Sequence, residues 1–539
     1  MTFLVSEAHR AVVFNPPDAR VFDVVPTAKP FPYKGHTLAA VPYRLDETRV
    51  LRNMGIDLPS PIGYLYEWPR DKVAIPEVMP LQKESSAFLT LNPRAHLLNG
   101  IGTGKTITNT WAIDFLLREG TFKKVLVVAP LSTLKDAWEN TIFFHFQHLK
   151  CNVLYGTAQR RRKLFLDDAD IYVINFDGLE TIVTKKVDSK GRLLDASFLR
   201  DDIGLVVIDE GSHYRNSGTD RYKVLHRALK PHMWCWNNTA SPTPQWPTDA
   251  WAQCRLVTPT TVPQYFLSFK NKTMRQITQY KWEPLPNAMD IVYEAMRPAL
   301  RFSRDQVFAD LHEPVYEDRS VDLTTAQRKH YQELMNELAT EIGAGQIIAS
   351  NEGVKMMKLV QAACGVLYDR QGQTHEVDCG PRINVVKEII EQCGEKVIVF
   401  APLEGVVQML HREISKLQRN GSSVTCEIVH GATSKANRDR IFSSFQRTPD
   451  PHVIVAHPGC MAHGLTLTEA STIVWYAPIN SNEIYMQANG RITRPGQKVV
   501  PMIVNIAATA LERKMYTRLK TKTALQGLLL DMVAQGGGV

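Results

Sequence analysis

The chain has 539 residues, of which 44% are hydrophobic and 22% are charged, and these are ordinary values for a soluble globular protein. Its 31 glycines and 31 prolines are too few for a collagenous or low-complexity chain, so disorder throughout is excluded. Lys and Arg number 63 against 55 Asp and Glu, and the net charge of +8 is compatible with a nucleic-acid partner without requiring one.

The first 75 residues are rich in proline and aromatic residues. Segments such as Phe14–Pro17 and Lys29–Gly35 show neither helical nor strand periodicity. Residues 1–75 are therefore predicted to form a small, irregular accessory region.

Short apolar runs alternate with helical patterns from residue 76 to residue 261. The order strand, helix, strand predicts a parallel sheet built from βαβ units. Helices are expected over Thr106–Arg118 and Leu134–Phe146. Strands are expected over Ala95–Leu98, Val125–Ala129, Ile171–Ile174, Leu205–Ile208 and Met233–Trp236.

The alternation weakens between residues 262 and 380 and returns from 381 to 539. The middle region is predicted to be a mostly helical linker with protruding helices at Thr325–Ile342 and Val354–Cys364. The last region ends in a basic amphipathic helix over Leu511–Lys522. Its strands are expected over Val397–Phe400, Cys426–Val429, Val453–Ala456, Ile473–Tyr476 and Met502–Ile506. The predicted fold class is α/β, with two parallel-sheet domains, a helical insert between them and a small N-terminal accessory region.

A glycine-rich segment, LLNGIGTGKT at residues 97–106, follows a predicted strand and precedes a predicted helix. Glycines at such a junction let backbone N–H groups turn onto phosphate oxygens at the positive end of the helix. Lys105 is expected to reach the β- and γ-phosphates, and the Thr106 hydroxyl to hold Mg²⁺. Asn99 stands where the motif usually has its first glycine, and a glycine-rich turn with a surface lysine is the alternative interpretation. The residues expected to bind the nucleotide phosphates are Gly100, Gly102, Thr103, Gly104, Lys105 and Thr106.

The apolar run Leu205–Ile208 ends in two adjacent acids, Asp209 and Glu210. Carboxylates at the C-terminal end of a parallel strand face the crevice where α/β sheets bind ligands. Asp209 is suited to hold Mg²⁺, usually through water, and Glu210 to orient and deprotonate an attacking water. The alternative is that the acids cap the following helix.

A third segment, QANGRITR at residues 487–494, lies in the second α/β block. Arg491 and Arg494 are three residues apart, so they are expected to share one helical face and to converge on one anion. An arginine pair on a different domain from the phosphate loop is suited to neutralise charge on a departing γ-phosphate. A solvated basic helix face is the alternative.

In this order and spacing, the three segments resemble those of a superfamily-two helicase or translocase with two RecA-like domains. Residues 487–494 match the QxxGRxxR motif of that superfamily at every fixed position. Finer matches resemble its Swi/Snf-like branch, especially compact phage-encoded members, and the likeness covers about residues 78 to 525. These matches lie at Val127–Leu134 with Trp138, Arg215–Asn216, Thr239–Gln245, Asp249–Trp251, Gly464–Thr468 and Arg494–Gln497.

The resemblance implies an ATPase that uses ATP and Mg²⁺, with Gln82 reading the adenine and with Thr106 and Asp209 holding the metal. Two positions depart from the family where hydrolysis is coupled to movement, because Ser212 replaces the usual His and Ser241 a common Thr. The catalytic residues implied are Lys105, Asp209, Glu210, Gln487, Arg491 and Arg494.

The resemblance also implies contacts to the phosphate backbone of one DNA strand, which are independent of sequence and sensitive to salt. Two basic runs, residues 160–163 and the exposed side of residues 513–520, are either further contacts or solvated helix faces. Trp475, Tyr476 and Tyr485 are expected to pack in the core rather than to stack on bases. The residues implied to contact nucleic acid are Ser132, Thr133, Lys135, Asn175, Gly464 and Thr466.

The predicted function is a DNA-stimulated ATPase that moves along double-stranded DNA, with targeting supplied by residues 1–75 or by partner proteins. One alternative is a strand-separating or fork-remodelling helicase, for which the Val183–Leu194 insert is the candidate pin. The other is an ATP-gated DNA clamp without turnover. A monomer is expected, although the sequence leaves the oligomeric state open.

The eight cysteines form no CxxC pair or Cys/His cluster, which argues against a disulfide scaffold or a structural zinc. The apolar runs are too short to span a membrane, and the first residues lack the pattern of a signal peptide. We therefore expect a cytoplasmic protein with no membrane partner, in the host cytoplasm if it is phage-encoded.

Overall fold

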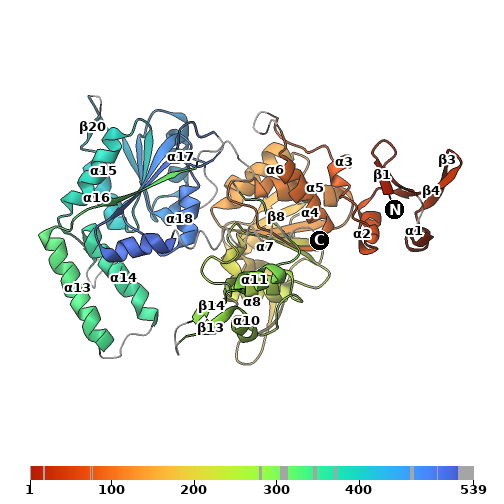
Figure 1. The fold of residues 1–539 in the computed structure, drawn as a ribbon, viewed down its shortest axis with the longest axis horizontal. Coiled ribbons are helices and arrows are strands. Elements are labelled where there is room, and N and C mark those ends of the chain that lie inside the picture. The colour runs from red at the N-terminus through yellow and green to blue at the C-terminus, as the bar shows by residue number, and fades with distance from the viewer. Residues whose placement is uncertain are drawn as a thin grey trace. The chain divides into compact units, whose positions relative to one another are not determined.

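The computed structural model describes residues 2–15, 19–72, 75, 77–277, 282–303, 313–343, 349–368, 373–419, 421–461, 466–494 and 496–519. The chain divides into a first unit, mainly residues 1–307, and a second unit, mainly residues 308–527. Each unit contains its own large parallel sheet (Figure 1). The predicted α/β class with two parallel-sheet domains is confirmed.

A four-stranded antiparallel sheet forms the N-terminal part, so the expectation of an irregular region is wrong. One face buries Val12, Phe14 and Val41 together with Val21 and Leu51 of two helices, α1 (Ala19–Val24) and α2 (Leu45–Asn53). The sequence did not predict these strands because they are short. One of them, KPFPY, also carries two prolines, which an edge strand tolerates. The strand order is β1-β2-β4-β3, with bounds β1 Thr2–Ser6, β2 Ala11–Asn15, β3 Lys29–Tyr33 and β4 His36–Pro42.

Residues 66–69 follow the short helix α3 (Ile62–Leu65). They pack against α5 (Lys105–Arg118), the helix after the predicted phosphate loop. The Tyr66 hydroxyl donates to Asp114 Oδ2 at 2.5 Å, and the Trp111 Nε1–H donates to the Pro69 carbonyl at 2.8 Å. Trp68 meets Trp111 edge to face, with ring centroids 5.5 Å apart. The N-terminal part is thereby joined to the first α/β layer through a buried aromatic contact.

The sheet of the first unit has seven strands in the order β15-β5-β12-β11-β6-β8-β7, and all its pairings are parallel. Its central strands are continuous apolar runs, as expected where helices cover both faces. All five strands predicted in residues 76–261 are present. The bounds are β5 Arg94–Leu97, β6 Lys124–Ala129, β7 Cys151–Val153, β8 Ile171–Asn175, β11 Ile203–Asp209, β12 Trp234–Asn238 and β15 Ala299–Leu300.

Helices connect these strands. The predicted helix over Leu134–Phe146 begins as a π-helix, η1 (Leu134–Glu139), and continues as α6 (Asn140–His145). Residues 183–198 form a two-stranded hairpin of β9 (Val183–Val187) and β10 (Leu193–Phe198). The other helices are α4 Pro80–Leu91, α5 Lys105–Arg118, α7 Ala158–Leu166, η2 Phe176–Ile182, η3 Gly211–Tyr214, α8 Asp220–Ala228, α9 Asp249–Val257, α10 Phe266–Thr273 and α11 Ala288–Ala295.

The second unit has a six-stranded parallel sheet in the order β16-β25-β24-β19-β23-β22. All five strands predicted after residue 381 are present. Trp475, Tyr476 and Tyr485 are almost completely buried, which confirms that they pack in the core. The bounds are β16 Val315–Ser320, β19 Lys396–Phe400, β22 Cys426–Val429, β23 Val453–Ala456, β24 Ala470–Trp475 and β25 Met502–Ala507.

The helices of the second unit cover its sheet, and α13 and α14 lie side by side as a protruding pair (Figure 1). The last described helix, residues 510–519, buries Met515, Tyr516 and Leu519 and exposes Arg513 and Arg518, while Lys520 lies outside the described residues. The remaining helices are α13 Thr325–Gly343, α14 Ala349–Cys364, α15 Gly380–Gln392, α16 Glu404–Ile414, α17 Lys435–Arg447, η4 Pro458–Cys460 and α18 Asn482–Asn489.

The region from 262 to 380 is less purely helical than predicted. Its helices α10 and α11 belong to the first unit, and Ala299–Leu300 adds the edge strand β15 to the first sheet. Val315–Ser320 adds the edge strand β16 to the second sheet. The sequence did not predict β15 because it has only two residues. It did not predict β16, VYEDRS, because that strand is largely polar, as is common at a sheet edge.

Candidate nucleotide and nucleic-acid sites

The phosphate-loop candidate joins β5 to α5 at the carboxyl edge of the first sheet. Gly102 and Gly104 have φ angles of 83° and 79°, a region that side chains strain to adopt. A Cβ on Gly104 would also come within 2.5 Å of the Gln82 Nε2. Gln82 is buried on α4, and its Nε2 donates to the Thr103 carbonyl at 3.3 Å. The residue expected to read adenine therefore lies directly against the loop expected to bind phosphates.

Asn99 stands at the position of the usual first glycine, and its side chain hydrogen-bonds the loop to α4 and to Phe302. Its Nδ2 donates to the Ser85 hydroxyl of α4 at 2.8 Å, and its Oδ1 accepts from the Phe302 N–H at 2.9 Å. The Gly100 N–H donates to the Phe302 carbonyl at 3.0 Å. Because Asn99 is almost completely buried, the departure from the motif supplies two side-chain anchors that a glycine lacks.

Lys105 lies near enough to Asp209 for its charge to act on the pKa of that carboxyl. The Lys105 Nζ donates to the carbonyl oxygens of Asn99 and Gly100, each at 3.1 Å. Asp209 ends β11, and its Oδ2 accepts a hydrogen bond of 2.9 Å from the Trp138 Nε1–H. Burial raises the pKa of Asp209, whereas the Trp138 hydrogen bond and the nearby Lys105 charge lower it. A buried carboxylate beside a lysine and a glycine cradle fits a Mg²⁺–nucleotide, whose metal takes oxygen ligands.

The turn after Asp209 has a strained backbone at Glu210, and the Asn237 side chain packs against it at Gly211. Glu210 has a φ angle of 54°, which is uncommon for a residue with a side chain. A Cβ on Gly211 would overlap the Asn237 side chain, so this position of the acid motif requires glycine. The Asn237 Nδ2 donates to His96 Nδ1 at 3.1 Å and to Gln253 Oε1 at 3.2 Å. Burial lowers the pKa of His96 to about 3, so this contact stays neutral at physiological pH.

The acid motif contacts the loop after β8. His213 lies on η3 and stacks on Phe176 of η2, with ring centroids 4.7 Å apart and planes inclined by 26°. Phe176 directly follows Asn175, a predicted nucleic-acid residue at the end of β8. A Cβ on Gly178 would clash with both the Asn175 Oδ1 and the Arg161 guanidinium. Of the basic run 160–163, Arg161 therefore lies beside the predicted nucleic-acid loop.

The other predicted nucleic-acid residues of the first unit follow β6. Ser132 and Lys135 are exposed at the start of η1. Thr133 is buried, and its hydroxyl donates to the Pro130 carbonyl at 3.0 Å, so its side chain shapes the turn. Because β6 and β8 are parallel neighbours, the Ser132–Lys135 segment and Asn175 lie at the same sheet edge as the phosphate loop.

In the second unit, α18 ends at Asn489, so Arg491 and Arg494 lie in a turn and not on one helical face as predicted. The helix stops at Gly490, its C-cap residue, because glycine disfavours the continuation of a helix. Arg491 is almost completely buried, and its carbonyl accepts from the Leu467 N–H at 3.1 Å. Gln487, on α18, is also buried, and its Oε1 has no hydrogen-bond partner among the described residues.

Arg494 contacts a residue predicted to bind nucleic acid. Its Nη1 donates to the Thr466 hydroxyl at 2.8 Å, and its Nε donates to the Gly490 carbonyl at 3.0 Å. Thr466 is exposed, whereas the predicted residue Gly464 lies outside the described residues. The two sites predicted in the second unit are thus joined by a hydrogen bond, which no motif spacing indicates.

Trp138 offers a direct test of the Asp209 environment. Replacing it by Phe removes the hydrogen bond that favours the ionised carboxylate, so the pKa of Asp209 should rise further. The acidic limb of the kcat/KM profile for ATP hydrolysis should then move to higher pH. The matched control is Trp236→Phe, because Trp236 is equally buried but donates to the Asn92 carbonyl. A Trp138→Phe profile that superimposes on the wild-type profile would contradict this role.

Comparison with known proteins identifies two family models in the chain. The SNF2-related domain matches residues 92–371, just over half of the chain, and the Helicase conserved C-terminal domain matches residues 381–496. The chain is similar to protein p41 of Acyrthosiphon pisum secondary endosymbiont phage 1, with 25% identity over 81% of this chain and 94% of that protein.

Eukaryotic relatives are longer. The TATA-binding protein-associated factor mot1 of Schizosaccharomyces pombe is 20% identical over 78% of this chain and 24% of that protein. The DNA annealing helicase and endonuclease ZRANB3 of Homo sapiens is 22% identical over 84% of this chain and 40% of that protein. The chain thus spans less than half the length of these two relatives.

Among solved structures, the Sulfolobus solfataricus SWI2/SNF2 ATPase core in complex with dsDNA is 20% identical, with a TM-score of 0.39. The alignment covers 86% of this chain and 94% of that chain. Among the residues that the structure describes here, no helix combines the length and apolarity needed to cross a bilayer.

Proposed function

This chain belongs to the SNF2-related family and is an ATP-hydrolysing enzyme, and from this premise we propose that it uses ATP to move along double-stranded DNA. The observation that carries the proposal is the shared edge of the first sheet. The loops after β5 and β11 carry the residues that we propose to bind nucleotide, and those after β6 and β8 carry the residues that we propose to bind DNA. The stack of His213 on Phe176 joins the two sets, which supports a coupling of hydrolysis to DNA grip.

In the proposed hydrolysis of ATP, each candidate nucleotide-site residue of the first unit has its own role. Lys105 would compensate charge on the β- and γ-phosphates. Thr106 and Asp209 would hold Mg²⁺, which supplies charge neutralisation at the phosphates when bound. Glu210, held in its strained turn, would orient the attacking water and accept its proton. Gln82 would contact the adenine from its place against the loop.

The second unit would contribute the charge that stabilises the transition state. Arg491 and Arg494 are proposed to engage the γ-phosphate when ATP draws the units together, and Gln487 to complete this motif. Because Arg494 binds Thr466, engagement of Arg494 by phosphate would release a residue of the proposed DNA grip. The alternation of grip between the units would then produce steps along the backbone.

ATP turnover with different nucleic acids tests the proposal. Rates are measured without nucleic acid and with single-stranded DNA, duplex DNA or RNA. Duplex DNA is expected to stimulate at least as well as single-stranded DNA. Raised salt should suppress the stimulation, because backbone contacts release counterions. If the rate of ATP turnover is the same with and without every nucleic acid, the result would contradict the DNA part of the proposal. The assignment as an ATPase would not be affected.

The β9–β10 hairpin favours a second candidate, a strand-separating helicase. The hairpin leaves the apolar side chains of Val187 and Leu194 more than half exposed, as a wedge between base pairs requires. A wedge must offset the loss of stacking, on average about 1.4 kcal/mol per base-pair step. Unwinding of a tailed duplex distinguishes this candidate from translocation without strand separation.

A further inference from the structure

The outer face of the N-terminal sheet carries a group of apolar residues, although an antiparallel sheet normally presents polar residues to water. Val12, Phe14 and Val41 point into the core, so their alternate neighbours point outward. The strand register places these outward residues in rows, with Phe31 opposite Leu38 and Tyr33 opposite His36. The open face, as we define it, carries the apolar residues Leu4, Val13, Phe31, Tyr33, Leu38 and Ala40 together with the polar residues Lys29 and His36, and Leu38 is its buried member.

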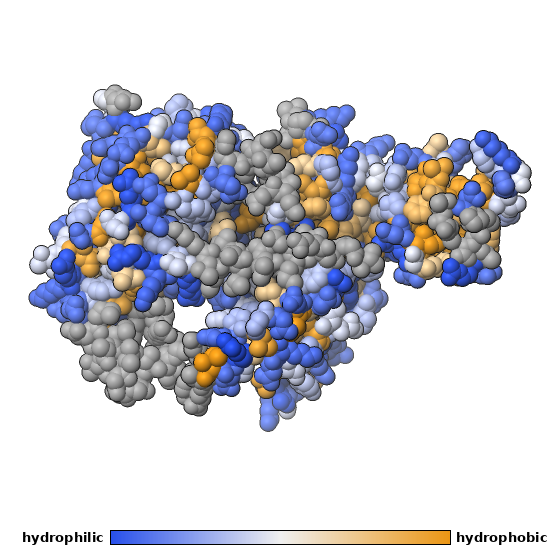
Figure 2. All heavy atoms as spheres, viewed as in Figure 1, coloured by the Kyte–Doolittle hydropathy of each residue, from blue (hydrophilic) through white to orange (hydrophobic). Residues whose placement is uncertain are grey.

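Two aromatic rings stand on this open face. Phe31 is 46% exposed and Tyr33 is 51% exposed. Their rings are nearly parallel, inclined by 17° with centroids 6.5 Å apart, and the Lys34 ammonium lies 5.2 Å from the Tyr33 centroid. Figure 2 shows apolar residues reaching the visible surface of the N-terminal part. A pair of exposed, aligned rings beside a cation is the platform on which unpaired bases stack.

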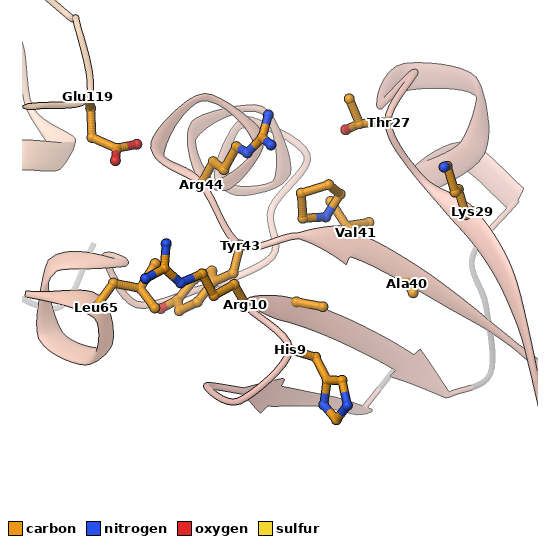
Figure 3. A pocket seen from close by; sticks show the side chains of 12 residues that line it. His9, Arg10, Thr27, Lys29, Ala40, Val41, Tyr43, Arg44, Leu65 and Glu119 are labelled. Atoms are coloured by element: carbon orange, nitrogen blue, oxygen red, sulfur yellow. The ribbon is translucent and has the colours of Figure 1, made fainter.

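A basic cavity of about 450 Å³ adjoins the same face. Lys29 lines it and lies on the same side of β3 as Phe31, because the two residues are two positions apart on the strand, with only Pro30 between them. Arg10 and Arg44 line it from the β1–β2 turn and from the residue before α2 (Figure 3). All three cations are exposed. Glu119 is the acid on the opposite wall, and burial raises the pKa of its carboxyl.

We propose that the open face and the basic cavity together bind a single-stranded segment of DNA, with bases on Phe31 and Tyr33 and phosphates at Arg10, Lys29 and Arg44. The inference goes beyond movement along duplex, because it gives the chain a second DNA site that selects a structure containing unpaired bases. The charge of the cavity matches a polynucleotide backbone. Stacking on aromatic side chains tolerates any base, so binding is independent of sequence.

The β3 edge of the sheet is unsuited to pairing with a strand of a second copy of this chain. β3 is an edge strand, and its alternate residues Pro30 and Pro32 lack the N–H donors that strand pairing needs. The β3 edge, which borders Phe31 and Tyr33, is therefore protected from sheet extension.

The test measures equilibrium binding of the full-length protein, without nucleotide, to a fluorescent single-stranded oligonucleotide and to a blunt duplex. The double variant Phe31→Ala/Tyr33→Ala should bind the single strand about fivefold or more weakly, the loss expected for a removed stacking ring. Its duplex binding and its duplex-stimulated ATP turnover should match the wild type. The conservative variant Phe31→Tyr/Tyr33→Phe keeps both rings and should restore binding.

A stacking readout makes the result specific. A single strand carrying 2-aminopurine should lose fluorescence on binding the wild type and should keep it on binding the alanine variant. Lys29→Gln/Arg44→Gln should weaken single-strand binding and reduce its salt dependence. Unchanged single-strand affinity in the alanine variant, or an equal loss for duplex, would overturn the proposal. A change in self-association measured by sedimentation, with unchanged DNA binding, would also overturn it and identify a second copy as the occupant.

Discussion

Lys105→Ala is expected to abolish ATP turnover. Lys105 is the cation at the start of α5, and its Nζ lies against the loop carbonyls of Asn99 and Gly100. A bound γ-phosphate would replace these carbonyls as its partner, and alanine leaves that charge without compensation. DNA binding without nucleotide should survive, because the proposed DNA residues follow different strands. Turnover is measured with saturating duplex DNA, and DNA affinity by fluorescence anisotropy.

Lys123→Ala is the matched control for this variant. Lys123 is an exposed lysine between α5 and β6, outside the proposed sites. It should leave turnover and DNA binding unchanged. Near wild-type turnover in Lys105→Ala would remove the phosphate-loop assignment.

Arg494→Ala is expected to leave ATP affinity largely intact while reducing turnover. An arginine that stabilises charge on the γ-phosphate strengthens its contact in the transition state, so in the proposed role the loss of Arg494 should lower kcat. Losses on the order of 10³-fold are typical of such arginines. The measurement pairs steady-state turnover with equilibrium binding of a fluorescent ATP analogue.

The control for this variant is Arg447→Ala, an exposed arginine at the end of α17 and outside the QANGRITR segment. It should behave as the wild type. A collapse of ATP affinity in Arg494→Ala, with normal turnover at saturation, would instead make Arg494 a ground-state binding residue.

The central strands of both sheets could be predicted because their apolar runs reflect burial on two faces. KVLVVA in β6 and KVIVF in β19 leave no polar face for solvent. The edges could not be predicted in this way. β16 and the N-terminal strands are short or partly polar, and they are defined by their pairing with distant residues.

The candidate site was predictable where a motif fixes local backbone. The left-handed φ of Gly104 follows from the phosphate-loop pattern. The contacts that support the phosphate loop and the acid motif could not be predicted, because they join residues that are far apart in the sequence. The Asn99 bond to Phe302 and the packing of Asn237 on Gly211 belong to this class. The expected helical face of Arg491 and Arg494 was wrong because spacing alone cannot show that α18 ends before them.

Displacement of a third strand from a DNA triplex tests the central claim most directly. The purified protein is given ATP and a duplex that carries a triplex-forming oligonucleotide, and in parallel a plain duplex with a single-stranded tail. Movement along duplex without strand separation predicts ATP-dependent release of the third strand and no unwinding of the tailed duplex. Efficient unwinding of the tailed duplex, with single-stranded DNA as the better activator of ATP turnover, would contradict the account and favour a helicase that uses the β9–β10 hairpin.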